Sequence, residues 1–284
     1  MKRLCQKFVL LSIVLMATFA SCHAACTASG TTLAFGSYTG VQITPTSVVT
    51  TNCTVTPSTV ALNAGTGSGA TTTTRVMAGP SGAKLNYQIF QNSTHTTNWG
   101  NTVGTNTLTV TGTGAKANTV YALMAAGQAP TPGTYTDTIT ISVTSSAGTQ
   151  TGTFSVTATV SPYCTISATS LAFGTYTGVL KNVNSTVNVT CTNTTPYNVG
   201  LNAGTSTGAT VKTRKMTQSS NTLSYSLFSN SGLTTGWGNT VGTDTLAGTG
   251  SGSLQALTVY GQIPAGQYVV PGSYADTITA TITY

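Results

Sequence analysis

The chain has 284 residues with a formal net charge of +7, and only 5% of its residues are charged. It contains no glutamate, two histidines and three aspartates (Asp137, Asp244 and Asp276), so a catalytic triad or a carboxylate pair has few residues from which to be built. Basic residues are also few, with ten lysines and arginines in total. We interpret their longest run, 212–215, as a solvated strand end, not as a nucleic-acid site. The composition therefore argues against an enzyme, and we expect no catalytic residue, no cofactor and no metal.

Residues 1–24 are interpreted as a secretory signal peptide. The apolar run 8–20 follows a positively charged start, and Cys22-His23-Ala24 resembles a small-x-small cleavage site. The run is too short to span a bilayer, so we expect cleavage after Ala24 or Ala25 and no membrane span. Lipidation of Cys22 is the alternative. In either case we expect the protein to be exported through the periplasm, either to the cell surface or into the medium.

Two related units follow, which we place at residues 25–161 and 162–284. The stretch "CTASGTTLAFGSYTG" from Cys26 returns as "CTISATSLAFGTYTG" from Cys164, and "WGNTVGT" is identical at 99–105 and 237–243. A repeat of roughly 138 residues is too long for a solenoid unit, so it indicates two homologous domains.

Each unit consists of short segments rich in Val, Thr, Ile and Tyr that alternate in polarity between Gly, Pro and Asn turns. Clear examples are "TVNVTC" at 186–191, "LSYSLF" at 223–228 and "DTITATITY" at 276–284. This pattern predicts an all-β chain of two tandem immunoglobulin-like β-sandwiches. We expect Trp99 and Trp237 to pack in the core or a turn, and His95 to lie in an exposed loop.

Four cysteines remain after the signal peptide, and they permit three disulfide connectivities. The separations decide among these, because Cys26–Cys53 and Cys164–Cys191 both span 27 positions. We therefore predict one internal disulfide in each domain and an oxidising compartment.

The ordered motifs resemble the spore coat protein U domain family over nearly the whole mature chain. They are the cysteine-to-"LAFGxY" opening, "VxCT", "YxLF", "WG" and the closing "PG(S/T)YxDTITxTITY". Many members are pilins of archaic chaperone–usher pili, which drive surface attachment and biofilm formation, and two-domain members resemble tip adhesins. The resemblance implies pilin-type sandwiches and four partners: a periplasmic chaperone, an outer-membrane usher, an adjacent pilin subunit that donates a strand, and an abiotic or host surface.

The two units end differently, which predicts which of them needs a donated strand. The first continues through "TFSVTATV" at 153–160, where an internal completing strand would point inward through Phe154, Val156, Ala158 and Val160. The second reaches only Tyr284, so we expect a chaperone and donor-strand edge at Tyr274, Thr277, Ile278, Ile282 and Tyr284. At most two residues precede Cys26 after cleavage, which favours a tip subunit with no strand to donate.

The adhesive surface is predicted at the place where the units differ most. "YALMAAGQAPTPG" at 121–133 places Leu123 and Met124 in a candidate loop where the second unit has Gln262 and Ile263. An exposed apolar pair would contact a hydrophobic surface, and burial of both side chains in the core is the alternative. At the level of the whole protein, the rivals to a pilus tip adhesin are a structural coat or extracellular-matrix protein, a lectin-like binding module using Trp99, and, more distantly, a secreted hydrolase.

Overall fold

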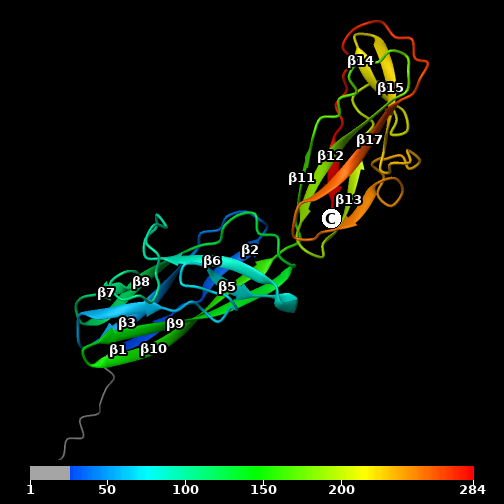
Figure 1. Ribbon diagram of the computed structural model, residues 1–284. Coiled ribbons are helices and arrows are strands. Elements are labelled where there is room, and N and C mark those ends of the chain that lie inside the picture. The colour runs from blue at the N-terminus through cyan, green and yellow to red at the C-terminus, as the bar shows by residue number, and fades with distance from the viewer. Residues whose placement is uncertain (1–25) are drawn as a thin grey trace, which may run out of the picture.

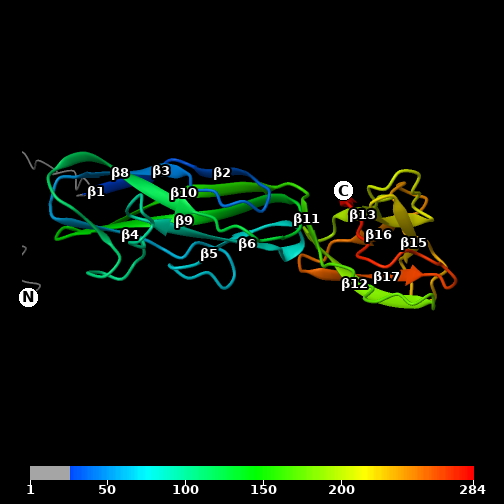
Figure 2. The same cartoon turned by 90° about the horizontal axis from the view of Figure 1, so that it is seen from above.

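The computed structural model describes residues 26–284, so the predicted signal peptide and Cys22 lie outside the described residues. Apart from one 3-10 turn, η1 (Pro80–Gly82), every regular element of this part of the chain is a β-strand. The strands form two domains that lie end to end in both views (Figures 1 and 2). The predicted all-β class of two tandem sandwiches is confirmed. No helix in residues 26–284 is long and apolar enough to cross a membrane.

The first domain is a closed sandwich of ten strands. The strands pair continuously in the order β1-β3-β8-β6-β5-β9-β10-β2, and β4 pairs with β9 and with β7. A single pair between β5 and β9, Ala78 with Thr136, joins the layer β1-β3-β8-β6-β5 to the layer β7-β4-β9-β10-β2. The strands are β1 (Cys26–Gly30), β2 (Leu33–Tyr38), β3 (Thr46–Cys53), β4 (Ser58–Leu62), β5 (Arg75–Ala78), β6 (Lys84–Phe90), β7 (Leu108–Val110), β8 (Gly114–Leu123), β9 (Gly133–Ser145) and β10 (Gly148–Val160).

The second domain repeats the first layer but only part of the second. Its layers have the orders β11-β12-β17-β15-β14 and β16-β13-β18. The strands are β11 (Cys164–Ala168), β12 (Lys181–Cys191), β13 (Pro196–Leu201), β14 (Arg214–Gln218), β15 (Asn221–Phe228), β16 (Leu246–Thr249), β17 (Gln255–Ile263) and β18 (Ala280–Thr283). Among the described residues no strand corresponds to β10, as the fold prediction anticipated, and none corresponds to β2.

Each domain is closed at its first strand by the predicted disulfide. Cys26 and Cys53 lie directly opposite each other in the β1–β3 ladder, and Cys164 and Cys191 do so in the β11–β12 ladder. Both bonds, Cys26–Cys53 and Cys164–Cys191, are formed with the same sequence separation of 27. The prediction from equal spacing is confirmed.

The last strand of the second domain is shorter than the sequence pattern predicts. Alternation suggested a strand over 276–284, but only Ala280–Thr283 forms one, through its ladder with β13. Its counterpart β9 is 13 residues long and pairs with β10 along its full length. Residues 271–279 have no such partner, so their backbone groups cannot complete a ladder.

Candidate strand-acceptor groove in the second domain

The alternating side chains before and within β18 are less buried than their counterparts in the first domain. On β9, Tyr135, Ile139, Ile141 and Val143 are all 0% exposed. The equivalent residues of the second domain, Tyr274, Ile278, Ala280 and Ile282, point toward the core but are only partly buried. The same sequence pattern therefore forms a sealed core in one domain and the wall of an open groove in the other.

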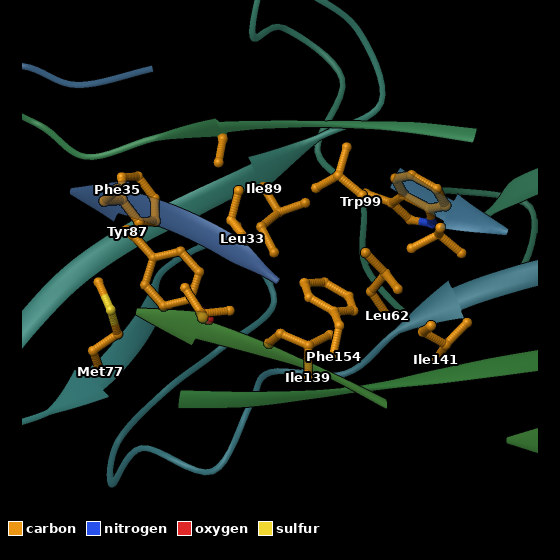
Figure 3. Packing of buried hydrophobic residues seen from close by; sticks show 14 of the residues in the cluster. Leu33, Phe35, Leu62, Met77, Tyr87, Ile89, Trp99, Ile139, Ile141 and Phe154 are labelled. Carbon is orange, nitrogen blue, oxygen red and sulfur yellow. The ribbon is translucent and has the colours of Figure 1, made fainter. Parts of the chain in front are cut away.

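Strand β10 is what seals the first domain. It runs antiparallel to β9 and parallel to β2, so it fills the space between these two strands. Its inward side chains Phe154, Val156, Ala158 and Val160 are at most 4% exposed. Figure 3 shows Phe154 among labelled core residues that include Leu62 and Ile139.

The corresponding space in the second domain holds two adjoining cavities of about 410 Å³ and 580 Å³. Leu171, Phe173, Met216 and Tyr274 line both, so the two cavities form one groove. Apolar side chains that line only one of them include Ala168, Val187, Leu201, Leu227, Val259, Ile278, Ala280, Leu223, Ile263, Val269 and Val270. An apolar groove beside unpaired backbone is suited to an added β-strand.

The opposite wall of the groove comes from the repeated "LAFGxY" segment. In the first domain this segment is β2, with Leu33 and Tyr38 0% exposed, whereas Leu171 and Tyr176 are partly buried and belong to no strand. Tyr176 is nevertheless anchored like its counterpart, because its hydroxyl donates to the Pro264 carbonyl at 2.7 Å while that of Tyr38 donates to Ala125 at 2.8 Å. The wall is therefore in place even though its β-ladder is missing.

The residues predicted for the donor-strand edge divide into two groups. Tyr274, Thr277 and Ile278 line the groove, and Tyr274 is shared by both cavities. Ile282 lies on β18 opposite Val199 of β13, and Tyr284 is 57% exposed; neither lines the groove. The sequence analysis did not assign Leu171, Phe173 or Met216 to the groove, although the repeated "LAFGxY" could have indicated the first two.

The predicted adhesive loop at Leu123 and Met124 is wrong. Leu123 is the last residue of β8 and is half-buried, while Met124 is 0% exposed and belongs to the core cluster. Met124 also bridges Ile43 through backbone hydrogen bonds in both directions, at 2.9 and 3.1 Å. Strand β8 continues to Leu123, inside the predicted loop, and the bridge to Ile43 keeps the chain extended at the next residue, so alternation turns Met124 inward.

Each domain contains a buried arginine that the sequence analysis missed. Arg75 and Arg214 are both 0% exposed, although Arg214 falls in the run interpreted as a solvated strand end. Arg214 donates to the carbonyls of Asn202, Val211, Leu201 and Trp237 at 2.7–2.8 Å. Arg75 donates to Asn63, Thr72, Leu62 and Trp99 at 2.7–3.3 Å. Burial lowers the pKa of Arg75 to about 10 and lowers that of Arg214.

Two of the three aspartates, Asp137 and Asp276, are held by hydrogen bonds within the fold. Asp137 accepts hydrogen bonds from the Tyr87 hydroxyl and the Thr66 backbone N–H, both at 2.7 Å. Asp276 repeats this with Tyr225 at 2.7 Å and Thr205 at 2.9 Å. Burial, with the neighbouring aspartate, raises the pKa of both tyrosines. These contacts tie Asp137 of β9, and Asp276 in the segment before β18, to neighbouring parts of each domain.

The tryptophans and His95 complete the list of candidate site residues. Trp99 and Trp237 are 0% exposed and donate through Nε1 to the carbonyls of Val60 and Val199 at 3.0 and 2.8 Å. Neither indole can offer its face to a sugar in this position. His95, expected to be exposed, is half-buried with its ring 5.2 Å from that of Phe90 in an edge-to-face contact.

A closed sandwich followed by one with an open, apolar, strand-shaped groove defines a tandem β-sandwich protein of which one domain is structurally incomplete. The model of the Spore Coat Protein U domain matches residues 12–142 and 150–281. The chain belongs to this family.

Two similar proteins bear on the fold and the relationship. The chain is 42% identical over 78 residues to Protein U of Myxococcus xanthus, a match that spans 43% of that protein's length and 27% of this chain. A chain from the crystal structure of the CsuC–CsuE chaperone–tip adhesion subunit pre-assembly complex of the archaic chaperone–usher Csu pili of Acinetobacter baumannii aligns at 19% identity. This alignment has a TM-score of 0.51 and covers 92% of this chain and 100% of that one. At this identity the likeness shows the shared fold.

Proposed function

We propose that the protein is a subunit of a surface pilus that is assembled by donation of a β-strand to its second domain. The observation that carries the proposal is the open groove lined by Leu171, Phe173, Met216 and Tyr274, compared with the same space filled by β10 in the first domain. A chaperone would supply the missing strand before assembly, and the adjacent pilin subunit would replace it, with an outer-membrane usher as the site of exchange. The shared fold with a chain of the Csu chaperone–tip adhesion subunit pre-assembly complex supports this assignment.

We further propose that the first domain is carried at the pilus tip and attaches the cell to a surface, which promotes biofilm formation. Its own β10 occupies its groove, so the first domain has no corresponding site for a donated strand. The likeness to the Csu pre-assembly complex supports a two-domain tip subunit. Export through the periplasm to the cell surface follows from this role.

Strand addition is tested by fusion. Residues 146–160, which contain β10, are attached directly after Tyr284, where they can fold back along 272–283 as β10 folds along β9. We expect the fused chain to be a soluble monomer with a cooperatively unfolding second domain, and the unfused chain to aggregate because its edge is open. A well-folded, monomeric unfused chain would contradict the proposal.

A structural coat role is the second candidate, favoured by the description of the family. It predicts that the protein forms sheets or shells without a dedicated chaperone. Expression with and without a chaperone encoded beside it separates the two, because only a pilus subunit should depend on it for its periplasmic yield.

A further inference from the structure

The first strand of the second domain presents more bulk to the groove than its counterpart presents to β10. Strands β1 and β11 pair in the same register, with Gly30 opposite Val49 and Ala168 opposite Val187. Ala168 therefore stands where the first domain has Gly30, and it lines the smaller cavity. This difference changes which strand can fit.

In the first domain, the missing side chain of Gly30 makes room for Phe154. A Cβ placed on Gly30 would lie 2.8 Å from both Cβ and Cδ1 of Phe154 and 2.9 Å from its Cγ. Carbon atoms in proteins pack at about 3.5–4.0 Å, so one of the two residues would have to move. Ala168 carries this Cβ, so a phenylalanine at the same position of an added strand would overlap it in the second domain unless one of the two residues shifts, which makes that strand fit less stably.

Two further differences between the domains shift side-chain bulk from the last strand to the first strand of the second domain. Ile166 replaces Ala28 on the first strand, near the position where β10 has Gly152. A Cβ on Gly152 would already lie 2.1 Å from the backbone oxygen of Ala28. On the other wall, Ala280 replaces Ile141. The groove of the second domain is thus narrower at its first strand and wider at its last strand. The side chains of β10 therefore match its shape less closely than they match the first domain.

We propose that Ala168 is a specificity-determining residue of the groove. It selects a donor strand that has glycine or alanine at the facing position, followed by apolar residues at alternate positions. It disfavours a strand with an aromatic residue there, which includes β10 of a second copy of this chain. The proposal rests on the proposed strand-acceptor function, and its consequence is that β10 of another copy of this protein completes the groove less stably than a donor with glycine or alanine at that position.

The test compares two donors in two backgrounds. The Phe donor is the 146–160 sequence fused after Tyr284, and the Gly donor is the same sequence with glycine at the position of Phe154. Each is made in the natural chain and in the Ala168→Gly variant, and the melting temperature of the second domain is followed by scanning calorimetry.

We expect Ala168→Gly to raise the melting temperature with the Phe donor by about 4 °C or more, because a steric overlap is removed. With the Gly donor it should lower the melting temperature by a few degrees, since glycine weakens a strand. If Ala168→Gly has the same sign with both donors, or no effect, the proposal is overturned while strand addition stands. If neither donor raises the melting temperature above that of the unfused chain, both the proposal and the acceptor function fail.

A matched control lies in the first domain. Gly30→Ala should lower the melting temperature of that domain in the natural chain, and this loss should be much smaller in a Phe154→Ala background. Equal losses in the two backgrounds would show that Gly30 and Phe154 do not compete for space, which would also overturn the proposal.

Discussion

In each domain, one buried arginine donates hydrogen bonds to four backbone carbonyls. Arg75 begins β5, and its planar guanidinium donates to four carbonyls, including those of Leu62 and Asn63 at the end of β4 and that of Trp99. A neutral side chain would leave these acceptors unsatisfied in an apolar interior. The repeat of this arrangement at Arg214 shows that it belongs to the fold and not to one binding site.

We predict that Arg75→Leu destabilises the first domain by about 3 kcal/mol, because several buried carbonyls lose their donors at once. Arg75→Lys should recover only part of this loss, since an ammonium group cannot reproduce the fork of the guanidinium. Urea unfolding of the first domain, residues 26–161, measures both. Lys84→Leu is the control on an exposed cation and should change the stability by about 0.5 kcal/mol or less.

Alkaline pH should unfold the first domain through its tyrosines. Burial raises the pKa values of Tyr38, Tyr87 and Tyr135. Unfolded tyrosine titrates near about 10, so the stabilisation by the neutral phenols is complete below that pH and is lost as pH rises through the folded values. Arg75 acts in the opposite direction, because its lowered pKa makes the unfolded state hold more protons above about pH 10.

Three tyrosines outweigh one arginine, so we predict that stability falls between about pH 10 and 12. Tyr87→Phe should make this fall less steep, although it also removes one donor from Asp137. The free energy of unfolding measured against pH decides the point. A stability that rises over this interval would show that the arginine dominates.

At the scale of elements, β10 determines whether the sandwich is closed. Its inward residues are buried against both walls, while Ser155 points outward and is exposed. We predict that Phe154→Ala destabilises the first domain by about 3–5 kcal/mol through the cavity that it leaves. Ser155→Ala, on the same strand, should stay within about 0.5 kcal/mol. Comparable losses for the two substitutions would mean that β10 contributes through its backbone alone.

At the scale of the whole molecule, the two domains meet through a small set of specific contacts. The Tyr163 ring packs edge-to-face on Tyr38 at 6.4 Å, and its hydroxyl donates to the Gln128 carbonyl. Asn193 of the second domain donates its backbone N–H to Ala129 and its side-chain amide to Thr131, both at 3.1 Å. These contacts hold the domains end to end, as Figures 1 and 2 show.

We predict that Tyr163→Ala combined with Asn193→Ala loosens this junction without unfolding either domain. Small-angle X-ray scattering of the strand-fused chain should then show a broader distribution of intramolecular distances. The two melting transitions should shift by only a few degrees, because the substituted residues lie at the surface between the cores. An unchanged distance distribution would mean that the side chains of Tyr163 and Asn193 do not hold the orientation.

The charge distribution of the first domain makes a prediction about attachment. Its Arg75 and Asp137 are buried, so among its described residues the lysines that reach solvent are Lys84 and Lys116. Surface attachment through this domain should therefore change little between about 0.05 and 0.5 M salt, since screening acts on exposed charges. The assay is inhibition of cell attachment by the isolated 26–161 domain. A steep loss of attachment with salt would place the adhesive surface elsewhere.

Much of this architecture could be predicted from the sequence, because it depends on local and repeated patterns. Period-two alternation identified the strands, the 27-residue separations identified both disulfides, and the repeat of "LAFGxY" and "WGNTVGT" identified two domains. Alternation over 153–160 also identified a strand in the first unit that the second does not contain. These signals survive in sequence because strand pairing and disulfide closure depend on spacing along the chain.

Only the tertiary structure decided which side of each element faces a neighbour across the sandwich. Met124 turned inward because it forms a bridge with Ile43 just after β8, and Arg214 became buried because four carbonyls from three separate segments converge on it. The difference between Gly30 and Ala168 looks conservative in the sequence. Its effect on packing appears only beside Phe154, which lies 124 positions after Gly30 along the chain. Packing between residues so distant in sequence depends on the whole three-dimensional arrangement, and neither alternation nor composition records it.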